Sequence, residues 1–334
     1  MRRIEFGCSV TRAATVVPRE GLTHSVRDDG RPVRRQLVLT PYDHLDWNKV
    51  KENALESERL GYDSVGISDH FVPPERFEAW TTIAALGALT SKIRISQHVL
   101  CVFFRGNPAV FARQVATLDV ITGGRLNLGL GAGYNQTEFE AYGIPFPKPG
   151  VRIQMLKEYV EILKRMWTEK RVTYQGKFYT VRDAECGPKP LQPHIPITIG
   201  GRKPKILRVA AEHADWVNVF NITLEEYREV IKILEEQCHI VGRDPKEIGL
   251  SWGEWLVLLP NRQEVERLKE KLETSPQTWH GTPQEYVERL RKFVDIGITE
   301  IGPAFMDQPD MTTMRLFAKE VIPAFRTQRT TSAE

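Results

Sequence analysis

Short runs of apolar and β-branched residues alternate along the chain with longer segments whose apolar residues recur at helical spacing. The short runs cover residues 4–10, 64–67, 93–102, 126–130, 195–199, 216–219, 250–259 and 298–301. Strands buried on both faces read as near-continuous apolar runs, and helical crossovers between them require parallel pairing. Eight such units predict an α/β fold, a closed (β/α)8 TIM barrel that spans residues 1–334 as a single domain.

An open doubly wound sheet is the structural alternative. Such a sheet normally carries a glycine fingerprint directly after its first strand. The first strand here runs into Cys8-Ser9-Val10, which is not a fingerprint of that kind. The closed barrel is therefore favoured.

Several predicted helices have recognisable ends. Asn107-Pro108 places a capping side chain before a proline at the first helical position, and Gly123-Gly124 ends the apolar pattern that follows. Capping boxes, each a threonine with a glutamate three residues later, begin at Thr223 and Thr282. Residues 151–167 carry apolar side chains at helical spacing.

Two segments interrupt the alternation. Residues 171–181 alternate in character around Gln175-Gly176, which predicts a small hairpin inserted before strand five. Residues 11–42 form a long connection after strand one, and connections of this length are typical of lids or mobile segments. This connection carries six arginines and three acidic residues, so its charge of +3 equals that of the whole chain.

Composition and charge mainly exclude classes of function and of binding partner. A net charge of +3 gives no reason to expect a nucleic-acid partner. No stretch approaches the ~20 apolar residues that span a membrane, and the first residues lack the apolar core of a signal peptide. Cys8, Cys101, Cys186 and Cys238 are too far apart to indicate a zinc site or a disulfide framework. We expect a cytoplasmic protein with a small-molecule substrate, no metal, and no membrane partner.

Candidate chemistry is expected at the carboxyl ends of the strands, where barrel active sites lie. Asp69 and His70 follow strand two and offer a hydrogen-bonding carboxylate beside a titratable imidazole, with a plain strand-end cap as the alternative. His98, a lone histidine in an apolar strand, is by itself more typical of a core residue. Glu254 on strand seven is compatible with a catalytic or an ion-paired role.

Two glycine-rich turns add a binding element. Gly131-Ala132-Gly133-Tyr134 follows strand four, where glycines permit close approach of a flat ligand. Gly200-Gly201-Arg202 follows strand five and opens a helix, where free amides and positive charge suit a phosphate, although the G-K-[ST] ending of a Walker motif is absent. With Asp69 and His70, these turns indicate a phosphorylated planar cofactor without specifying which one.

An ordered set of motifs extends from residue 50 to residue 220. It includes residues 58–71, which end in Ser-Asp-His-Phe, residues 123–135, which contain Gly-Leu-Gly-Ala-Gly-Tyr-Asn, and residues 138–145 and 199–201. In these motifs the chain resembles the luciferase-like monooxygenase superfamily, and within it the branch that uses coenzyme F420, a deazaflavin. The amino-terminal loop and the last third of the chain are similar only in outline.

The resemblance implies roles for individual residues. His70 would handle protons, with Asp69 and Tyr134 as further catalytic candidates. A non-prolyl cis peptide, frequent after strand three in this family, would fall at His98-Val99 and would bring both residues to the cofactor. The implied cofactor contacts are Asp69, His98, Val99, Ala132, Gly133, Tyr134, Gly200, Gly201 and Arg202.

The function implied by the resemblance is that of an F420-dependent oxidoreductase that moves a hydride between the deazaflavin and a small organic substrate. A homodimer or higher homo-oligomer is expected from the family. An FMN-dependent monooxygenase is the alternative, and a non-catalytic flavin-binding paralogue is a third hypothesis. In the family's glucose-6-phosphate dehydrogenases a glutamate follows the strand-four glycines and acts as an acid. Tyr134 takes that place here, which argues against a sugar-phosphate substrate.

Overall fold

Eight parallel strands close into a barrel in the computed structural model, which describes residues 4–9, 14–15, 40–41, 46–71, 77–271, 278–307 and 311–326. The strands are β1 (Glu5–Ser9), β4 (Ser64–Ile67), β5 (Arg94–Gln97), β7 (Leu126–Gly131), β10 (Ile197–Gly200), β11 (Trp216–Phe220), β12 (Gly249–Gly253) and β15 (Glu300–Ile301). Each pairs with the next in this order, and β15 pairs with β1, so the ring has no open edge. The predicted (β/α)8 barrel is confirmed, and the open sheet is excluded.

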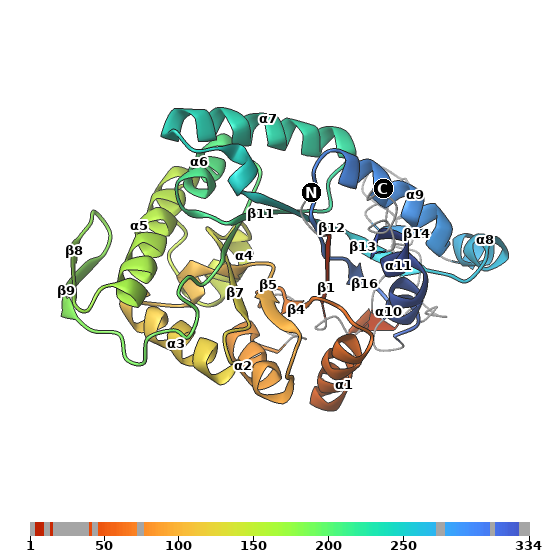
Figure 1. Ribbon diagram of the computed structural model, residues 1–334, viewed down its shortest axis with the longest axis horizontal. Coiled ribbons are helices and arrows are strands. Elements are labelled where there is room, and N and C mark those ends of the chain that lie inside the picture. Colours follow the sequence, from red (N-terminus) through yellow and green to blue (C-terminus); the bar gives the residue numbers. More distant parts are fainter. Residues whose placement is uncertain are drawn as a thin grey trace, which may run out of the picture.

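Helices follow the strands and form the outer ring of the molecule (Figure 1). They are α1 (Trp47–Arg59), α2 (Ala79–Leu89), α3 (Pro108–Ile121), α4 (Gln136–Ala141), α5 (Pro149–Thr168), α6 (Pro204–His213), α7 (Leu224–Val241), α8 (Arg262–Lys271), α9 (Pro283–Asp295), α10 (Thr312–Leu316) and α11 (Ile322–Arg326), with the short turns η1 (Val102–Phe104), η2 (Pro245–Glu247) and η3 (Phe317–Val321). Asn107 caps α3 as predicted, and both capping boxes are complete. None of the helices in the described part of the chain is both long and apolar enough to cross a membrane.

Two apolar runs expected as single strands are interrupted. The run 93–102 gives β5 and then, beyond His98 and Val99, the short β6 (Leu100–Cys101), which pairs with β7. The run 250–259 gives β12 and β13 (Trp255–Leu258), with Glu254 between them. Strand β13 pairs with β14 (Thr278–Gly281) and β16 (Ala304–Phe305) in a second parallel sheet. A polar side chain stands at both interruptions.

The hairpin predicted over residues 171–181 is present as β8 (Val172–Gln175) and β9 (Thr180–Ala184), and it lies outside the ring of helices (Figure 1). The turn of this hairpin is held by α5: the carboxylate of Glu158 accepts hydrogen bonds from the backbone N–H groups of Lys177, Phe178 and Tyr179. Most of the connection 11–42 lies outside the described residues. Its described parts, β2 (Ala14–Thr15) and β3 (Thr40–Pro41), pair antiparallel, and its role as a lid stays a prediction.

The interior of the barrel is polar rather than filled by branched aliphatic layers, which are the usual filling of this fold. The register pairs Gly200 with Asn218, Asn218 with Ser251, and Ser251 with Glu300. Residues paired in this way point to the same face of the sheet. Because Gly200 faces Val99 from two strands away, that face is the interior. Asn218 donates a hydrogen bond of 2.9 Å to the hydroxyl of Ser251 there.

Candidate active site

His70 lies at the carboxyl end of β4 and is held by a buried glutamate from α4. Its Nδ1 is 3.0 Å from Oε1 of Glu138, and the same oxygen accepts a 2.9 Å hydrogen bond from the backbone N–H of Phe71. The side chain of Glu138 is 3% exposed, whereas that of His70 is 25% exposed. The carboxylate therefore fixes the imidazole through Nδ1 and leaves Nε2 directed toward the mouth of the barrel.

Tyr134 lies beside this imidazole. Its hydroxyl is 3.5 Å from Nε2 of His70, at the long end of the hydrogen-bond range. The two rings meet edge to face with centroids 5.7 Å apart, and Tyr134 is 77% exposed. The structure thus brings together two of the predicted catalytic residues. It adds Glu138, which the sequence reasoning did not single out as a site residue.

Asp69 is oriented away from this group. Its carboxylate has no exposed surface, lies 3.1 Å from Nη2 of Arg105, and accepts a 2.9 Å hydrogen bond from the backbone N–H of Cys101. Arg105 also binds Glu78 at 2.6 Å. Burial raises the pKa of Asp69 to about 6, against the opposing effects of the Arg105 charge and the Cys101 N–H. Asp69 therefore ties β4 to the segment that follows β5.

Val99 fills the interior beside three glycines. The His98-Val99 peptide is cis, in agreement with the resemblance. A Cβ atom at Gly129, Gly131 or Gly200 would lie 3.0, 2.9 or 2.6 Å from the Val99 methyl groups, closer than ordinary contacts. Because Val99 remains partly exposed, its methyl groups and these bare backbones form an apolar floor at the carboxyl end of the barrel.

His98 points into the barrel below this floor. A Cβ atom at Gly66 would lie 3.1 Å from Cδ2 of the His98 ring, and Nε2 of His98 is 3.4 Å from Oε1 of Glu300. Burial lowers the pKa of His98 to about 4, so the imidazole is neutral at neutral pH. The sequence did not indicate Glu300 as a candidate site residue. The available signal was a charged residue within the apolar run 298–301, which is rare in a buried strand.

The turn after β7 is fixed from behind by Arg152. Its Nε donates a 3.2 Å hydrogen bond to the carbonyl of Ala132, and its guanidinium lies 3.9 Å from the centre of the Phe146 ring. Gly133 has a φ of +66°, and a Cβ there would lie 2.6 Å from the ring of Phe139. Glycine is therefore required for this turn, which keeps the mouth clear of side chains between Ala132 and Tyr134.

Gly200, Gly201 and Arg202 lead into α6. The residue before the helix, Lys203, makes no capping hydrogen bond through its side chain, and Pro204 occupies the first turn. The amino end of α6 is therefore free of a side-chain cap and suits an anion. Arg202 is 2.8 Å from Glu226, so its guanidinium already has a carboxylate partner.

The contacts of Glu254 decide between the two roles considered for it. Glu254 forms two hydrogen bonds of 2.9 Å with Arg289, which is the ion-paired one of the two roles considered for it. Within the described ranges, no group of three histidine, cysteine or acidic side chains is arranged to hold a metal ion.

The closed barrel, the histidine–glutamate pair at its carboxyl end and the glycine-lined floor together define a (β/α)8-barrel protein whose candidate site lies at its mouth. The chain belongs to the luciferase-like monooxygenase family, whose family model matches residues 25–276.

Three relatives illustrate what the chain is similar to. The chain is 29% identical over 320 residues to an F420-dependent glucose-6-phosphate dehydrogenase of Intrasporangium calvum, covering 83% of this chain and 95% of that one. Its fold is similar to that of an F420-dependent secondary alcohol dehydrogenase, with a TM-score of 0.75, 22% identity, and coverage of 97% and 99%. It is also similar to that of a long-chain alkane monooxygenase, with a TM-score of 0.77, 16% identity, and coverage of 100% and 94%.

Proposed function

We propose that this protein is a coenzyme F420-dependent oxidoreductase that transfers a hydride between the deazaflavin and a small organic substrate. The observation that carries the proposal is the His70–Glu138 pair at the mouth, beside a floor built from Val99 and glycine backbones. The choice of cofactor is supported by the F420-dependent dehydrogenases among the relatives.

The residues at the mouth fit such a cofactor. Val99, Gly131 and Gly200 offer a flat apolar surface on which a planar ring could rest without meeting side chains. The N–H of Gly201 already donates to the carbonyl of Asn218 at 3.1 Å, so at the amino end of α6, which has no side-chain cap, it is the backbone N–H of Arg202 that is offered to a phosphate beside Gly201. For Arg202 to take part, its guanidinium would share its charge between the phosphate and Glu226.

A bound deazaflavin supplies the carbon that accepts or donates the hydride. His70 handles the accompanying proton: when an alcohol is oxidised, Nε2 accepts the hydroxyl proton, and in the reverse direction it returns the proton to the carbonyl oxygen. Glu138 holds the ring in position through Nδ1 and stabilises the imidazolium that results, because its carboxylate lies 3.0 Å away. Tyr134 borders the same nitrogen and contributes an aromatic wall for the substrate.

Asp69 acts as a positioning residue rather than as a contact to the ring. Its buried carboxylate holds Arg105 and the backbone of Cys101, so it fixes the segment that follows the cis peptide. We expect Asp69→Asn to weaken cofactor binding several-fold while the protein remains folded, because the ion pair to Arg105 is lost. Asp215→Asn, which alters a carboxylate paired with His194 at the amino ends of the strands, is the control. An unchanged dissociation constant in Asp69→Asn would remove Asp69 from the site.

The substrate of the sugar-phosphate relatives is not extended to this chain. Tyr134 replaces the acidic residue expected for that reaction, and it stands largely exposed in the mouth. A small alcohol or carbonyl compound without a phosphate is the expected substrate.

A binding titration tests the cofactor directly. Purified protein is titrated separately with F420 and with FMN, and binding is followed by the change in cofactor fluorescence. We expect F420 to bind at least tenfold more tightly than FMN (roughly 1.4 kcal/mol). Tight binding of FMN without binding of F420 would replace the proposal with the FMN-dependent monooxygenase. Binding of neither would favour the non-catalytic paralogue.

A further inference from the structure

Ionisable side chains form a column through the barrel interior beneath Val99. At its upper end, Nε2 of His98 is 3.4 Å from Oε1 of Glu300, and Glu300 is only 3% exposed. Glu300 begins β15 and His98 directly follows β5, and β1 and β4 lie between these two strands, so the contact crosses the interior. The geometry does not form a hydrogen bond, and within the described residues Nδ1 of His98 and Oε1 of Glu300 have no hydrogen-bond partner.

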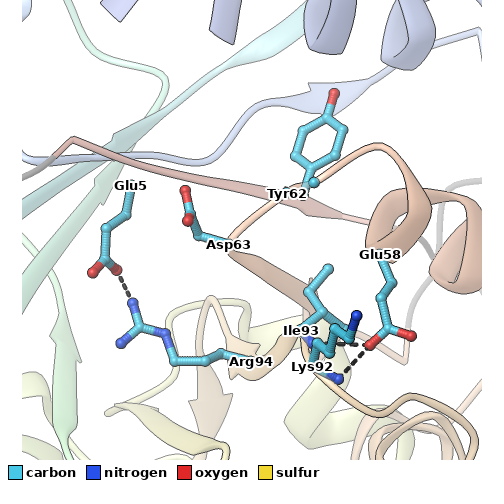
Figure 2. A pocket seen from close by; sticks show the side chains of 8 residues that line it. Glu5, Glu58, Tyr62, Asp63, Lys92, Ile93 and Arg94 are labelled. Carbon is cyan, nitrogen blue, oxygen red and sulfur yellow. Dashed lines mark hydrogen bonds and ion pairs between the residues drawn. The ribbon is translucent and has the colours of Figure 1, made fainter. Parts of the chain in front are cut away.

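The lower end of the column opens at the amino ends of the strands. Arg94 and Glu5 form an ion pair that borders a cavity of about 390 Å³. Figure 2 shows this pair, with Asp63 as another lining residue of the same cavity. The positive charge of Arg94 lowers the pKa of Glu300 and so favours its ionised form, whereas the negative charge of Asp63 raises that pKa. The column therefore places one cation between the solvent-facing cavity and the buried carboxyl.

Burial acts in opposite directions on the two upper groups. It raises the pKa of Glu300 to about 7, even though Arg94 and a hydrogen bond with Ser251 lower it. It lowers the pKa of His98 to about 4. Both groups thus favour their neutral forms, and the space beneath the floor is uncharged as long as Glu300 keeps its proton. The groups that face the pair are Glu5, Asp63, Arg94, Tyr227 and Ser251.

We propose that Glu300 is a positioning residue of the cofactor site: it shares a proton with His98 and thereby decides which ring nitrogen of His98 is protonated beneath Val99. The inference rests on the proposed function, because it takes the floor at Val99 as the place where the cofactor binds. It assigns to Glu300 a role that acts through His98, without contact to substrate or cofactor.

The two states differ by one proton. When Glu300 is protonated, a small rotation of the two side chains from their 3.4 Å approach lets its O–H donate to Nε2 of His98, and the ring proton is on Nδ1. When Glu300 is ionised, Nε2–H donates to the carboxylate, Nδ1 is bare, and one proton has gone to solvent. A change in ring tautomer therefore accompanies the titration of Glu300. A buried carboxyl that served only to fill space would produce no such change.

The test follows the ring nitrogens of His98 in the cofactor-free full chain. Protein labelled with 15N-histidine is titrated by NMR from about pH 5.5 to about pH 8.5, a range that brackets the Glu300 pKa of about 7. The chain contains eight histidines, and the signals of His98 are assigned by their loss in His98→Gln. We expect the Nδ1-protonated ring at low pH, the Nε2-protonated ring at high pH, and a single tautomer throughout in Glu300→Gln.

Two variants guard against a trivial result. Ser251→Ala removes the hydroxyl that favours the ionised carboxyl, so it should move the midpoint to higher pH while keeping the change of tautomer. Glu254→Gln alters another buried glutamate, one that binds Arg289 instead, and should leave the His98 signals unchanged. A His98 titration identical in the wild type and in Glu300→Gln would overturn the proposal. A failure of Glu300→Gln to fold would leave the Ser251→Ala shift as the deciding result.

A second measurement connects the pair to the cofactor. Above the Glu300 pKa the wild type carries a buried negative charge below the floor, which Glu300→Gln lacks. At about pH 8 the variant should therefore bind F420 up to roughly tenfold more tightly than the wild type, and at about pH 6 the two should bind alike. Equal affinities at both values would overturn the link to the cofactor site. Absence of F420 binding in the wild type would refute the proposed function, while the NMR titration would still decide the proton pair.

Discussion

One histidine–glutamate pair lies at the mouth of the barrel and another lies in its interior, and the two differ in hydrogen bonding and in surroundings. His70 and Glu138 are hydrogen-bonded at 3.0 Å, and the imidazole faces the mouth. His98 and Glu300 approach to 3.4 Å without a hydrogen bond, inside the barrel. The first carboxylate also accepts a backbone N–H, whereas the second depends on the charge of Arg94 and on Ser251.

The difference shows how surroundings assign roles to identical residues. A partly exposed imidazole with an oriented carboxylate behind it can exchange protons with a substrate. An imidazole that points into the barrel beside a buried, protonated carboxyl has no substrate to serve, and it controls charge and orientation instead. Each pair can be altered separately, so the comparison is open to experiment.

The largest effect is expected from removing the imidazole at the mouth. His70→Gln should lower kcat by about 10²–10⁴-fold, because it removes the group that accepts the substrate proton. Cofactor affinity, measured by fluorescence titration, should change little. The matched control is His194→Gln, which alters an exposed histidine paired with Asp215 at the other end of the barrel. A His70→Gln enzyme with near-normal kcat would assign proton transfer to another group.

A smaller loss is expected when only the charge behind that imidazole is removed. Glu138→Gln keeps an oxygen for the backbone N–H of Phe71 but no longer stabilises an imidazolium. Charge-assisted hydrogen bonds contribute about 1.5–3 kcal/mol, so kcat should fall by roughly 10–100-fold with little change in KM. A fall in thermal stability without a fall in kcat would give Glu138 a purely structural role.

For the buried pair, we expect an effect on stability with a defined pH dependence. Because burial raises the pKa of Glu300 from 4.5 to about 7, its stabilising contribution is fully present below pH 4.5 and is lost as the pH rises through about 7. Glutamine cannot ionise, so Glu300→Gln should exceed the wild type in unfolding free energy at about pH 8, by up to about 3 kcal/mol. The two should converge near about pH 4, below the unfolded-state pKa. Thermal melts at both values measure this, and parallel curves would contradict it.

The smallest effect on kcat is expected from a change at Tyr134, which lies beside the His70–Glu138 pair. Tyr134→Phe removes a hydroxyl that lies 3.5 Å from Nε2 of His70 while it keeps the aromatic ring. A hydrogen bond of that length is weak, so kcat should change by no more than about threefold. A loss comparable to that of His70→Gln would instead make Tyr134 the proton donor.

Most of the barrel could be predicted because its signals are local. Each strand is a short apolar run, and capping residues such as Asn107 and Thr223 act within one helical turn. The interruptions at His98 and Glu254 could not be predicted from hydrophobicity, because they depend on partners elsewhere in the chain. Glu254 is held by Arg289 from α9, the second helix after it along the chain, which no local pattern indicates.

The same distinction between local and long-range signals applies to the residues of the candidate site. His70, Tyr134 and the glycine turns follow strand ends, so the fold alone placed them at the mouth. Glu138 lies 68 residues from His70, and Arg105 lies 36 residues from Asp69. These contacts are made by tertiary packing and leave no periodic trace. The sequence therefore indicated the groups that face the mouth but missed the partners that orient them.

The floor has a consequence for engineering. Val99 touches the space beside three glycines, so none of the three can gain a methyl group while valine remains. Val99→Ala would release volume that a single alanine at Gly131 or Gly200 could then take up, whereas a Cβ at Gly129 would still lie 1.9 Å from the backbone carbonyl oxygen of Gln97. Val99, Gly131 and Gly200 therefore form one interlocked unit. Paired changes among these three positions could reshape the floor for ligands of different outline.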